Sequence, residues 1–250
     1  MFHVVIPARL ASARLPGKVL KKIGNKTMLE HVYDKAVNSG AESIIIATDA
    51  PEVLAVAEGF GATAMISCSQ HETGTDRIAE VVSQLDFEDD DIIVGLQADE
   101  PFLPHEVIVQ LAEEMQEHRN IKVASLYQPI EAPEELFDPH VTKVVLNHRN
   151  HALYFSRAPI PWSRDQFDPG QIPSSIPQDL YLRHIGLYAY RAHFLQEYVE
   201  MDPPSIEKVE YLEQLRILWH GVRIQMSCAK RQVPPGIDTL EDLNRAQSGA

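Results

Sequence analysis

Acidic and basic side chains gather in this sequence just after predicted strands. Arg9, Arg14 and Lys18 follow the first apolar run of the chain within ten residues, and Asp99 follows another apolar run. Arginine and lysine can neutralise a triphosphate, and Gly17 can adopt a positive φ that lets backbone amides approach a ligand. A carboxylate at a strand end suits Mg²⁺, which binds carboxylates, water and phosphate oxygens. These residues predict phosphate and metal chemistry; a solvated basic loop and a turn-capping aspartate are the alternatives.

A second candidate metal ligand lies near the C-terminus. Asp238 follows a short apolar stretch and precedes a predicted helix, where an aspartate is often only an N-cap. It can share a metal ion with Asp99 if the fold brings the two together. The acidic triplet 89–91 resembles the metal-binding DxD of glycosyltransferases, but it precedes a strand instead of following one. We therefore interpret that triplet as a solvated turn.

The polar loop 71–77 (HETGTDR) runs into another predicted helix. Thr73 and Thr75 can cap that helix, and free amides at a helix N-terminus can contact a phosphate or a base edge. Capping alone explains this segment equally well.

The second half of the chain contributes scattered polar residues that could meet in a cleft. Arginine and histidine would suit the carboxylate of an acidic sugar, and glutamate and glutamine would suit its hydroxyls. Each residue taken singly is better explained as a surface or interface residue. They are Arg157, Arg164, Arg183, His184, Tyr188, Glu213 and Gln214.

Alternating strands and helices in the first half must position these groups. This spacing predicts a mostly parallel sheet with helices on both faces, in which ligands bind beyond the carboxyl ends of the strands. The predicted strands are 3–7, 43–48, 63–67 and 92–97, and the predicted helices are 29–39, 52–60, 75–85 and one that begins at Pro104.

The second half has a different character. An irregular, proline-rich stretch at 158–177 is long for a plain connector, so it is either a functional loop or a mobile lid. We expect one long helix at 205–220, capped by Ser205, and a final helix at 238–247. The expected strands are 122–129, 142–146, 152–156 and 184–190.

Length and charge limit the function classes. The 250 residues suit one large α/β domain, or a main domain with a smaller lobe, and the formal net charge of −14 argues against a general nucleic-acid binder. We find no signal peptide and no run near the roughly 20 apolar residues of a membrane span. Cys68 and Cys228 read as reduced core thiols of a cytosolic protein.

Taken together, these segments resemble the 3-deoxy-manno-octulosonate (Kdo) cytidylyltransferases, also called CMP-Kdo synthetases. The resemblance runs in order from about residue 5 to residue 245, and its motifs are specific in combination although each is weak alone. They are IPARLASARLPGKVL, ATDAPEV, HETGTDRIAEV, LQADEPFLP, KVVL, ALYFSRAPIPWSRD, RHIGLYAYR, LEQLRIL and GIDTLEDL.

The resemblance implies a fold and a reaction. The fold is α/β, a Rossmann-like nucleotide-binding sheet, mostly parallel and flanked by helices, with a smaller, partly antiparallel sugar-binding and dimerisation part. It implies a single domain, 1–250, in which 1–120 mainly bind nucleotide, 121–225 mainly bind sugar and form the dimer, and 226–250 return to the nucleotide and metal site. The implied protein is a cytoplasmic homodimer that makes CMP-Kdo and pyrophosphate from CTP and Kdo with Mg²⁺, for lipopolysaccharide synthesis.

The resemblance also assigns roles to residues. Arg9 and Lys18 match CTP phosphate-binding positions and, with Asp99 and Asp238, the catalytic set; the two aspartates match the metal ligands. Gln97 lies beside the nucleoside, and the cytosine side is matched by His71, Thr73, Gly74 and Thr75. The sugar-binding positions are matched by Arg14, Arg157, Arg164, His184, Tyr188, Glu213 and Gln214.

Three positions depart from the family pattern. Ala98 replaces the glycine of the usual QGDEP, which matters only if that position needs a positive φ or close contact with the nucleotide; we expect ordinary backbone there. Leu10 and Val19 replace the common tyrosine and proline. A relative that uses 8-amino-Kdo or a sialic acid, and a nucleotide-binding relative without activity, remain as alternatives.

Overall fold

A single large sheet organises the computed structural model, which describes residues 1–12, 14–71, 73–177 and 179–248. The strand order along its main path is β11-β7-β10-β6-β1-β4-β5. All of these strands are mutually parallel except β10, which runs antiparallel to both of its neighbours. The strands are β1 (His3–Pro7), β4 (Ser43–Thr48), β5 (Thr63–Ile66), β6 (Ile92–Gly95), β7 (Val123–Pro129), β10 (Leu182–Arg191) and β11 (Ile224–Cys228).

Smaller strands extend this frame. β8 (Lys143–Leu146) pairs antiparallel with β10 and with β9 (Ala152–Ser156), so a small antiparallel part branches from the far end of β10. β2 (Lys22–Ile23) and β3 (Lys26–Thr27) form a separate hairpin. The α/β class with a smaller, partly antiparallel part is therefore confirmed.

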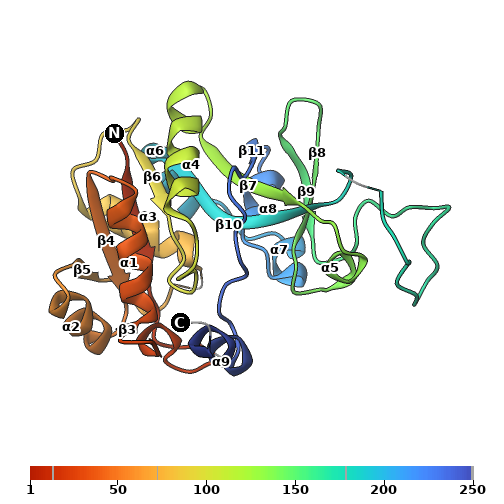
Figure 1. Cartoon of the computed structure of the whole chain (residues 1–250). Coiled ribbons are helices and arrows are strands. Elements are labelled where there is room, and N and C mark those ends of the chain that lie inside the picture. The colour runs from red at the N-terminus through yellow and green to blue at the C-terminus, as the bar shows by residue number, and fades with distance from the viewer. Residues whose placement is uncertain (13, 72, 178, 249–250) are drawn as a thin grey trace.

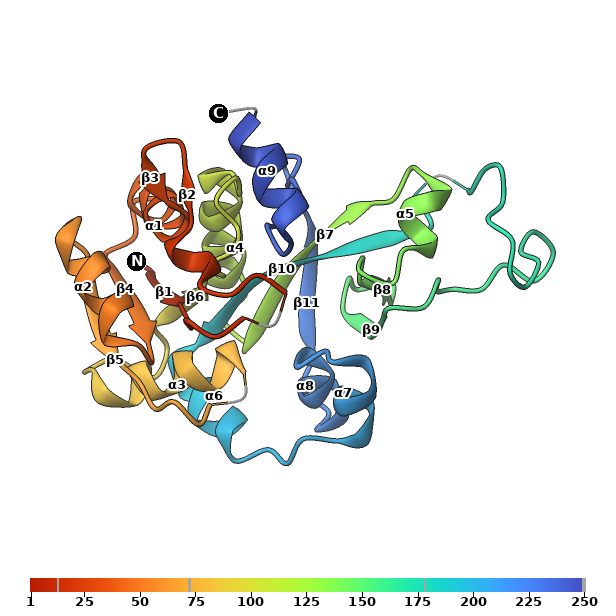
Figure 2. The same ribbon diagram turned by 90° about the horizontal axis from the view of Figure 1, so that it is seen from below.

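Helices cover both faces of the sheet (Figure 2). One face packs against α1 (Met28–Asn38), α2 (Pro51–Gly59) and α4 (His105–Glu117), and the other packs against α3 (Gly74–Gln84), α6 (Ala192–Val199) and α8 (Gln214–Trp219). The buried apolar strand residues fill both contacts, since strands covered on both faces need apolar side chains on each side. The remaining helical segments are η1 (Lys18–Leu20), α5 (Pro133–Phe137), α7 (Ser205–Glu210) and α9 (Leu240–Ser248).

The first half agrees closely with the predicted elements. Its apolar runs become strands, and α1 and α2 end just before the glycines predicted to close them, Gly40 with φ of 73° and Gly61 with φ of 87°. Thr27 caps α1 by accepting a hydrogen bond from the Glu30 amide at 3.2 Å. β6 ends at Gly95, two residues earlier than predicted, so Gln97 lies in the loop at the carboxyl end of the sheet.

The predicted single helix at 205–220 is wrong. Tyr211 adopts a left-handed conformation with φ of 53°, which separates α7 from α8. Ser205 is the first helical residue and not the cap; Pro204 occupies the N-cap position without a side-chain hydrogen bond. The break lets Glu207 in α7 meet Arg216 in α8 through two hydrogen bonds of 2.9 and 2.7 Å. The sequence analysis also missed α5, α6 and β11.

The stretch 158–177 contains no helix or strand and projects from the sheet as an arm (Figures 1 and 2). Phe167, near its middle, is buried with Tyr181, Ile130 and Leu136 in a small apolar cluster at its base. The arm is thus an irregular segment with one fixed anchor.

Two further expectations concern thiols and membranes. The prediction of core thiols is wrong, because Cys68 and Cys228 are both exposed and free; each lies at or just after the end of a strand, where packing is incomplete. Among the described residues, no helix combines the length and the apolar character that crossing a bilayer requires.

Candidate active site

Lys18 lies at the centre of the charged cluster that the sequence predicted. Its Nζ donates to Asp99 Oδ2 at 2.5 Å and to Asp238 Oδ1 at 3.0 Å. Gly17, with φ of 66°, lets the loop turn back so that its amide reaches the carbonyl of Leu10 at 3.2 Å. Burial alone would lower the pKa of the Lys18 ammonium, but the two carboxylates outweigh it and raise that pKa.

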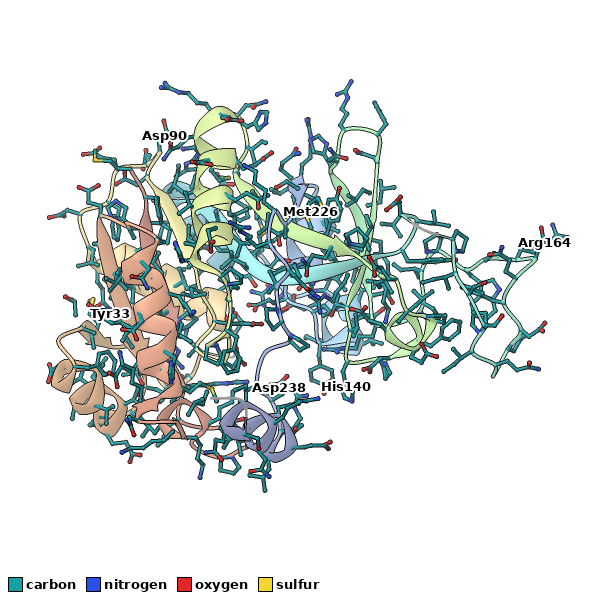
Figure 3. All side chains as sticks on the ribbon, viewed as in Figure 1. Tyr33, Asp90, His140, Arg164, Met226 and Asp238 are labelled. Carbon is teal, nitrogen blue, oxygen red and sulfur yellow. The ribbon has the colours of Figure 1, made fainter. Side chains whose placement is uncertain are left out.

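Residues far apart in the chain meet at this point. The Ile237 amide donates to the Asp99 carbonyl at 2.9 Å, which docks the C-terminal segment on the loop after β6. Gly236 allows this approach, since a Cβ there would lie 3.0 Å from Glu100 Oε1 and 3.1 Å from the Asp99 carbonyl oxygen. Asp238, labelled in Figure 3, also pairs with Arg14 at 2.9 Å. The cluster therefore includes four predicted site residues: Arg14, Lys18, Asp99 and Asp238.

Glu100 adds a third carboxyl group that the sequence analysis did not single out. Burial and the neighbouring Asp99 raise its pKa to about 8, although Arg183 and Lys18 oppose this. The position of Glu100, directly after the predicted metal ligand Asp99, could have indicated that it belongs to the site. With a pKa of about 8, the Glu100 carboxyl is mostly protonated near pH 7, so the negative charge beside the Lys18 ammonium comes from Asp99 and Asp238.

The loop before α3 lies beside the loop after β6. Thr73 caps α3 by accepting from the Asp76 amide at 3.1 Å, as expected. Thr75 is not a cap but lies inside the helix. The side-chain amide of Gln97 lies within 3.6 Å of where a Cβ on Gly74 would stand, an ordinary van der Waals distance, so these two predicted nucleotide-binding residues are neighbours.

His71 and Arg9 lie outside these contacts. His71 Nε2 pairs with Glu80 Oε2 at 2.5 Å, and the same carboxylate accepts from the Cys68 amide at 2.8 Å. His71 thereby helps to fix the loop that leads to Thr73. Arg9 is exposed at the start of the loop that carries Lys18.

Asp49 and Arg77 connect the loop that carries Lys18 to helix α3. Arg77 is buried and its Nη2 donates to Asp49 Oδ2 at 3.2 Å, while Asp49 Oδ1 accepts from the Leu10 amide at 3.4 Å. The sequence placed Asp49 at the end of a strand without giving it a role. A buried arginine on the expected helix 75–85 was the missed partner.

Of the two predicted sugar-binding residues of β10, Tyr188 is buried and His184 is partly buried. Burial lowers the pKa of the His184 imidazole to about 3, so His184 is neutral near pH 7. Its ring contacts Phe155 and Tyr188, and its Nε2 lies 3.2 Å from Ser125 Oγ. A sugar carboxylate near His184 would therefore meet a neutral hydrogen-bonding ring and not a positive charge; its role in sugar binding stays a prediction.

Several buried polar atoms on this side have no hydrogen-bond partner within the described part of the chain. Tyr188 Oη and Gln214 Nε2 are among them. An unpaired buried polar group is costly, and it is often retained where a ligand completes its hydrogen bonds. Both residues were predicted to bind sugar, and their unpaired hydrogen-bonding atoms are available to a polar ligand.

Glu213 joins the two sides of the site. Its Oε2 accepts from the Thr75 amide at 3.3 Å, and burial raises the pKa of its carboxyl. Arg216, which the sequence quoted but left without a role, fixes this helix through Glu207 and lies 3.7 Å from Asp76 Oδ1. The position of Arg216, a charged residue on the apolar face of the predicted helix 205–220, could have indicated this role.

The arginines of the second half are dispersed. Arg157 donates to the Glu210 carbonyl at 2.7 Å and to the Pro139 carbonyl at 3.0 Å. Arg164 lies exposed near the outer end of the arm, far from Asp238 (Figure 3). Arg183 does not face a cleft, since its Nη2 donates to Gln128 Oε1 and to the Val233 carbonyl. The structure does not bring these three arginines together within one chain.

Comparisons with known proteins identify the family of the chain. A family model described as cytidylyltransferase matches residues 3–224. The 3-deoxy-manno-octulosonate cytidylyltransferase of Coxiella burnetii is 55% identical over 250 residues, covering 99% of this chain and 98% of the relative. The enzyme of that name from Pasteurella multocida is 47% identical over 254 residues, covering 99% and 97%.

A solved structure points the same way. The structure of CMP:2-keto-3-deoxy-manno-octonic acid synthetase complexed with CTP matches with a TM-score of 0.88 at 36% identity, covering 99% of this chain and 98% of that chain. With near full-length identity to proteins of one name and the same fold, the chain belongs to the 3-deoxy-manno-octulosonate cytidylyltransferases, within the cytidylyltransferase family.

Proposed function

We propose that this chain transfers CMP from CTP to the anomeric hydroxyl of Kdo and releases pyrophosphate, which activates Kdo for lipopolysaccharide synthesis. The observation that carries the proposal is the meeting of Lys18, Asp99 and Asp238 at the carboxyl end of the sheet. The relatives named after this reaction, and the related structure that holds CTP, supply the nucleotide and the sugar.

The reaction is a displacement at the α-phosphorus. The anomeric hydroxyl of Kdo loses its proton to water and its oxygen forms a bond to phosphorus, while the bond from phosphorus to the bridging oxygen of the β-phosphate breaks and pyrophosphate leaves. The chain's own task is largely positioning, because two anionic substrates repel each other and must be held in line. In this proposal Lys18 and Arg9 neutralise the triphosphate, and Thr73, Gly74 and Gln97 border the nucleoside.

Asp99 and Asp238 would hold Mg²⁺. Both carboxylates already contact one positive charge, the Lys18 ammonium, so the pair fits a small cation. Across the described ranges there is no cluster of three or more His, Cys, Asp or Glu side chains, and Mg²⁺ commonly takes one or two carboxylates with phosphate oxygens and water. When bound, the ion lowers the pKa of a hydroxyl and offsets phosphate charge.

Buried groups on the other side suit the sugar. Tyr188 and Gln214 offer unpaired polar atoms, Glu213 an acceptor and His184 a neutral ring. Such groups discriminate strongly against a ligand that lacks the matching hydroxyl, since they would stay unpaired.

We also propose that the chain works as a cytoplasmic homodimer. Four large apolar side chains on α7, α8 and β9, or at the ends of these elements, are exposed. Exposed apolar patches often mark protein–protein contacts. They are Leu153 (58% exposed), Val209 (80%), Tyr211 (85%) and Trp219 (63%). Light scattering on the purified protein should give twice the monomer mass.

The test of the reaction is pyrophosphate release with CTP, Kdo and Mg²⁺. Release that requires all three supports the proposal, and no release under these conditions contradicts it. Competition between Kdo, 8-amino-Kdo and a sialic acid in one assay identifies the sugar.

A further inference from the structure

The segment between β11 and α9 carries Asp238 into the site, and it lacks a partner strand. From 229 to 238 it runs as irregular chain, descending from β11 to α9 in Figure 1. Backbone hydrogen bonds hold its two ends, from the Ala229 amide to the Tyr127 carbonyl at 2.9 Å and from the Ile237 amide to the Asp99 carbonyl at 2.9 Å. We call residues 229–237 the return segment.

Two glutamine side chains replace the missing strand. Gln110 Nε2 donates to the Cys228 carbonyl at 2.8 Å, and its Oε1 accepts from the Lys230 amide at 2.8 Å. Gln128 Nε2 donates to the Arg231 carbonyl at 3.0 Å, and its Oε1 accepts from the Val233 amide at 3.2 Å. Each side-chain amide thus satisfies one donor and one acceptor, as a neighbouring strand would do.

Arg183 completes the second of these contacts. Its Nη2 donates to Gln128 Oε1 at 2.6 Å and to the Val233 carbonyl at 2.5 Å. Its Nε lies 3.6 Å from Glu135 Oε1, which holds the guanidinium from the other side. The buried Val233 is therefore fixed at both its amide and its carbonyl.

The position of Asp238 follows from these fixed points. Val233 is held by Gln128 and Arg183, and Ile237 is held by the Asp99 carbonyl. Both ends of the short piece of chain that leads to Asp238 are therefore fixed in position. Gly236 has no spare room beside Glu100 and Asp99. A return segment released at Val233 would let Asp238 move away from Asp99 and Lys18.

We propose that Gln128 and Arg183 are positioning residues for the reaction: they hold the return segment so that Asp238 stays beside Asp99 and Lys18. The inference rests on the proposed function for its catalytic consequence, but its structural part concerns the substrate-free chain. Neither residue is expected to touch substrate.

The experiment compares three variants. Gln128→Met removes every hydrogen bond with little change in volume. Gln128→Glu keeps oxygens that accept from Arg183 and the Val233 amide, and loses only the donation to Arg231. Gln196→Met is the matched control, because Gln196 donates to a backbone carbonyl elsewhere, that of Ala79, at 3.3 Å.

Two readouts are needed. The first is hydrogen exchange at the Ile237 amide in substrate-free protein without metal, which should be about tenfold faster in Gln128→Met. The second is pyrophosphate release titrated with Mg²⁺, in which the half-saturating Mg²⁺ concentration should rise about tenfold while the KM for Kdo is unchanged; removing an outer support of a metal ligand has effects of this size. Gln128→Glu should restore most of both, and Gln196→Met should match the parent.

Three results would overturn the inference. One is Ile237 exchange in Gln128→Met equal to that of the parent, and another is Gln128→Glu as impaired as Gln128→Met. The third is an equal loss for every substrate, which indicates general damage. If the parent itself releases no pyrophosphate, the proposed reaction fails, while the exchange result alone still decides whether Gln128 holds the segment.

Discussion

The proposed nucleotide side and the proposed sugar side of the site differ in how their polar groups are satisfied. On the nucleotide side, Lys18, Asp99 and Asp238 are partly exposed and pair by charge; Asp238 also pairs with Arg14, which was predicted to bind sugar. On the sugar side, Tyr188 and Gln214 are buried polar groups whose hydrogen-bonding atoms lack partners in the described chain, and His184 is neutral.

This difference teaches how each side can respond to its ligand. The charged side is already balanced without substrate, because ammonium and carboxylate offset one another. On the buried side, the unpaired polar atoms lower the stability of the free protein, and a ligand that hydrogen-bonds to them removes this cost. The first should therefore govern rate, and the second should govern which sugar is accepted.

The largest effect should come from breaking the charged side. Asp99→Asn removes a carboxylate charge with little change in shape, and kcat should fall more than about 1,000-fold, or about 4 kcal/mol of transition-state stabilisation. Pyrophosphate release measures the rate and urea unfolding checks the fold. Asp34→Asn, which breaks a surface pair with Lys26, should leave both unchanged. Near-normal turnover in Asp99→Asn would remove Asp99 from the metal role.

A smaller effect should separate the buried side from the charged one. Tyr188→Phe removes an unpaired buried hydroxyl, so kcat/KM for Kdo should fall about 10- to 30-fold with the KM for CTP unchanged. The free protein should gain about 1 kcal/mol of stability, since the unpaired group is gone.

Tyr198→Phe is the control for this change, because Tyr198 Oη is also buried without a partner in the described chain but was not assigned to the sugar. It should give the stability gain without the loss for Kdo. Equal losses in both variants, in steady-state kinetics and urea unfolding, would contradict the division between the two sides.

The neutral state of His184 predicts a dependence of stability on pH. Its ordinary pKa is 6.5 and its folded pKa is about 3, so between these values the unfolded chain binds the extra proton and stability falls as the pH decreases. The loss due to His184 approaches about 1.4 kcal/mol for each pH unit.

Urea unfolding at pH 6.5 and pH 4.5 measures this loss, and His184→Gln should lose less than the parent over that interval. His105→Gln changes an exposed histidine and should follow the parent. A His184→Gln variant that also follows the parent would show that the ring is protonated in the folded protein.

The smallest effect should come from Ala98, between Gln97 and Asp99. Its φ is not positive and its methyl group is buried in the core, so Ala98→Gly should cost about 0.5–1 kcal/mol of stability and change kcat less than about twofold. Thermal unfolding and pyrophosphate release check both. An increase in kcat of more than about fivefold would mean that the alanine crowds the nucleotide.

Much of the charged side could be predicted because it depends on local signals. Asp99 and Lys18 follow strands whose apolar runs are plain in the sequence, and parallel strands end at one edge of a sheet. The expectation of ordinary backbone at Ala98 is likewise confirmed. Asp238 needed the fold, since the return segment is placed by side chains with no periodic pattern.

The buried side was harder to predict. Whether a histidine is charged depends on the groups around it, and those around His184 come from Phe155 and Ser125, distant in sequence. The break at Tyr211 escaped notice because the apolar spacing of 205–220 suits one helix, while the Glu207–Arg216 pair that favours two is a tertiary contact. The roles of Arg157 and Arg164 in binding sugar stay a prediction.

Strand β10 has a consequence for how the enzyme can move. Its ten residues pair with β6 near one end and with β8 at the other, and they pair with β7 on both sides of a register shift between Ile185 and Tyr188, so one strand spans both proposed substrate regions. A hinge that swings one region against the other would have to rupture ladder bonds in the interior of the sheet, which rank among the last to open in a folded protein. We therefore expect adjustment to ligands mainly in the loops at the rim of the sheet and in the arm, which carry no such ladder bonds.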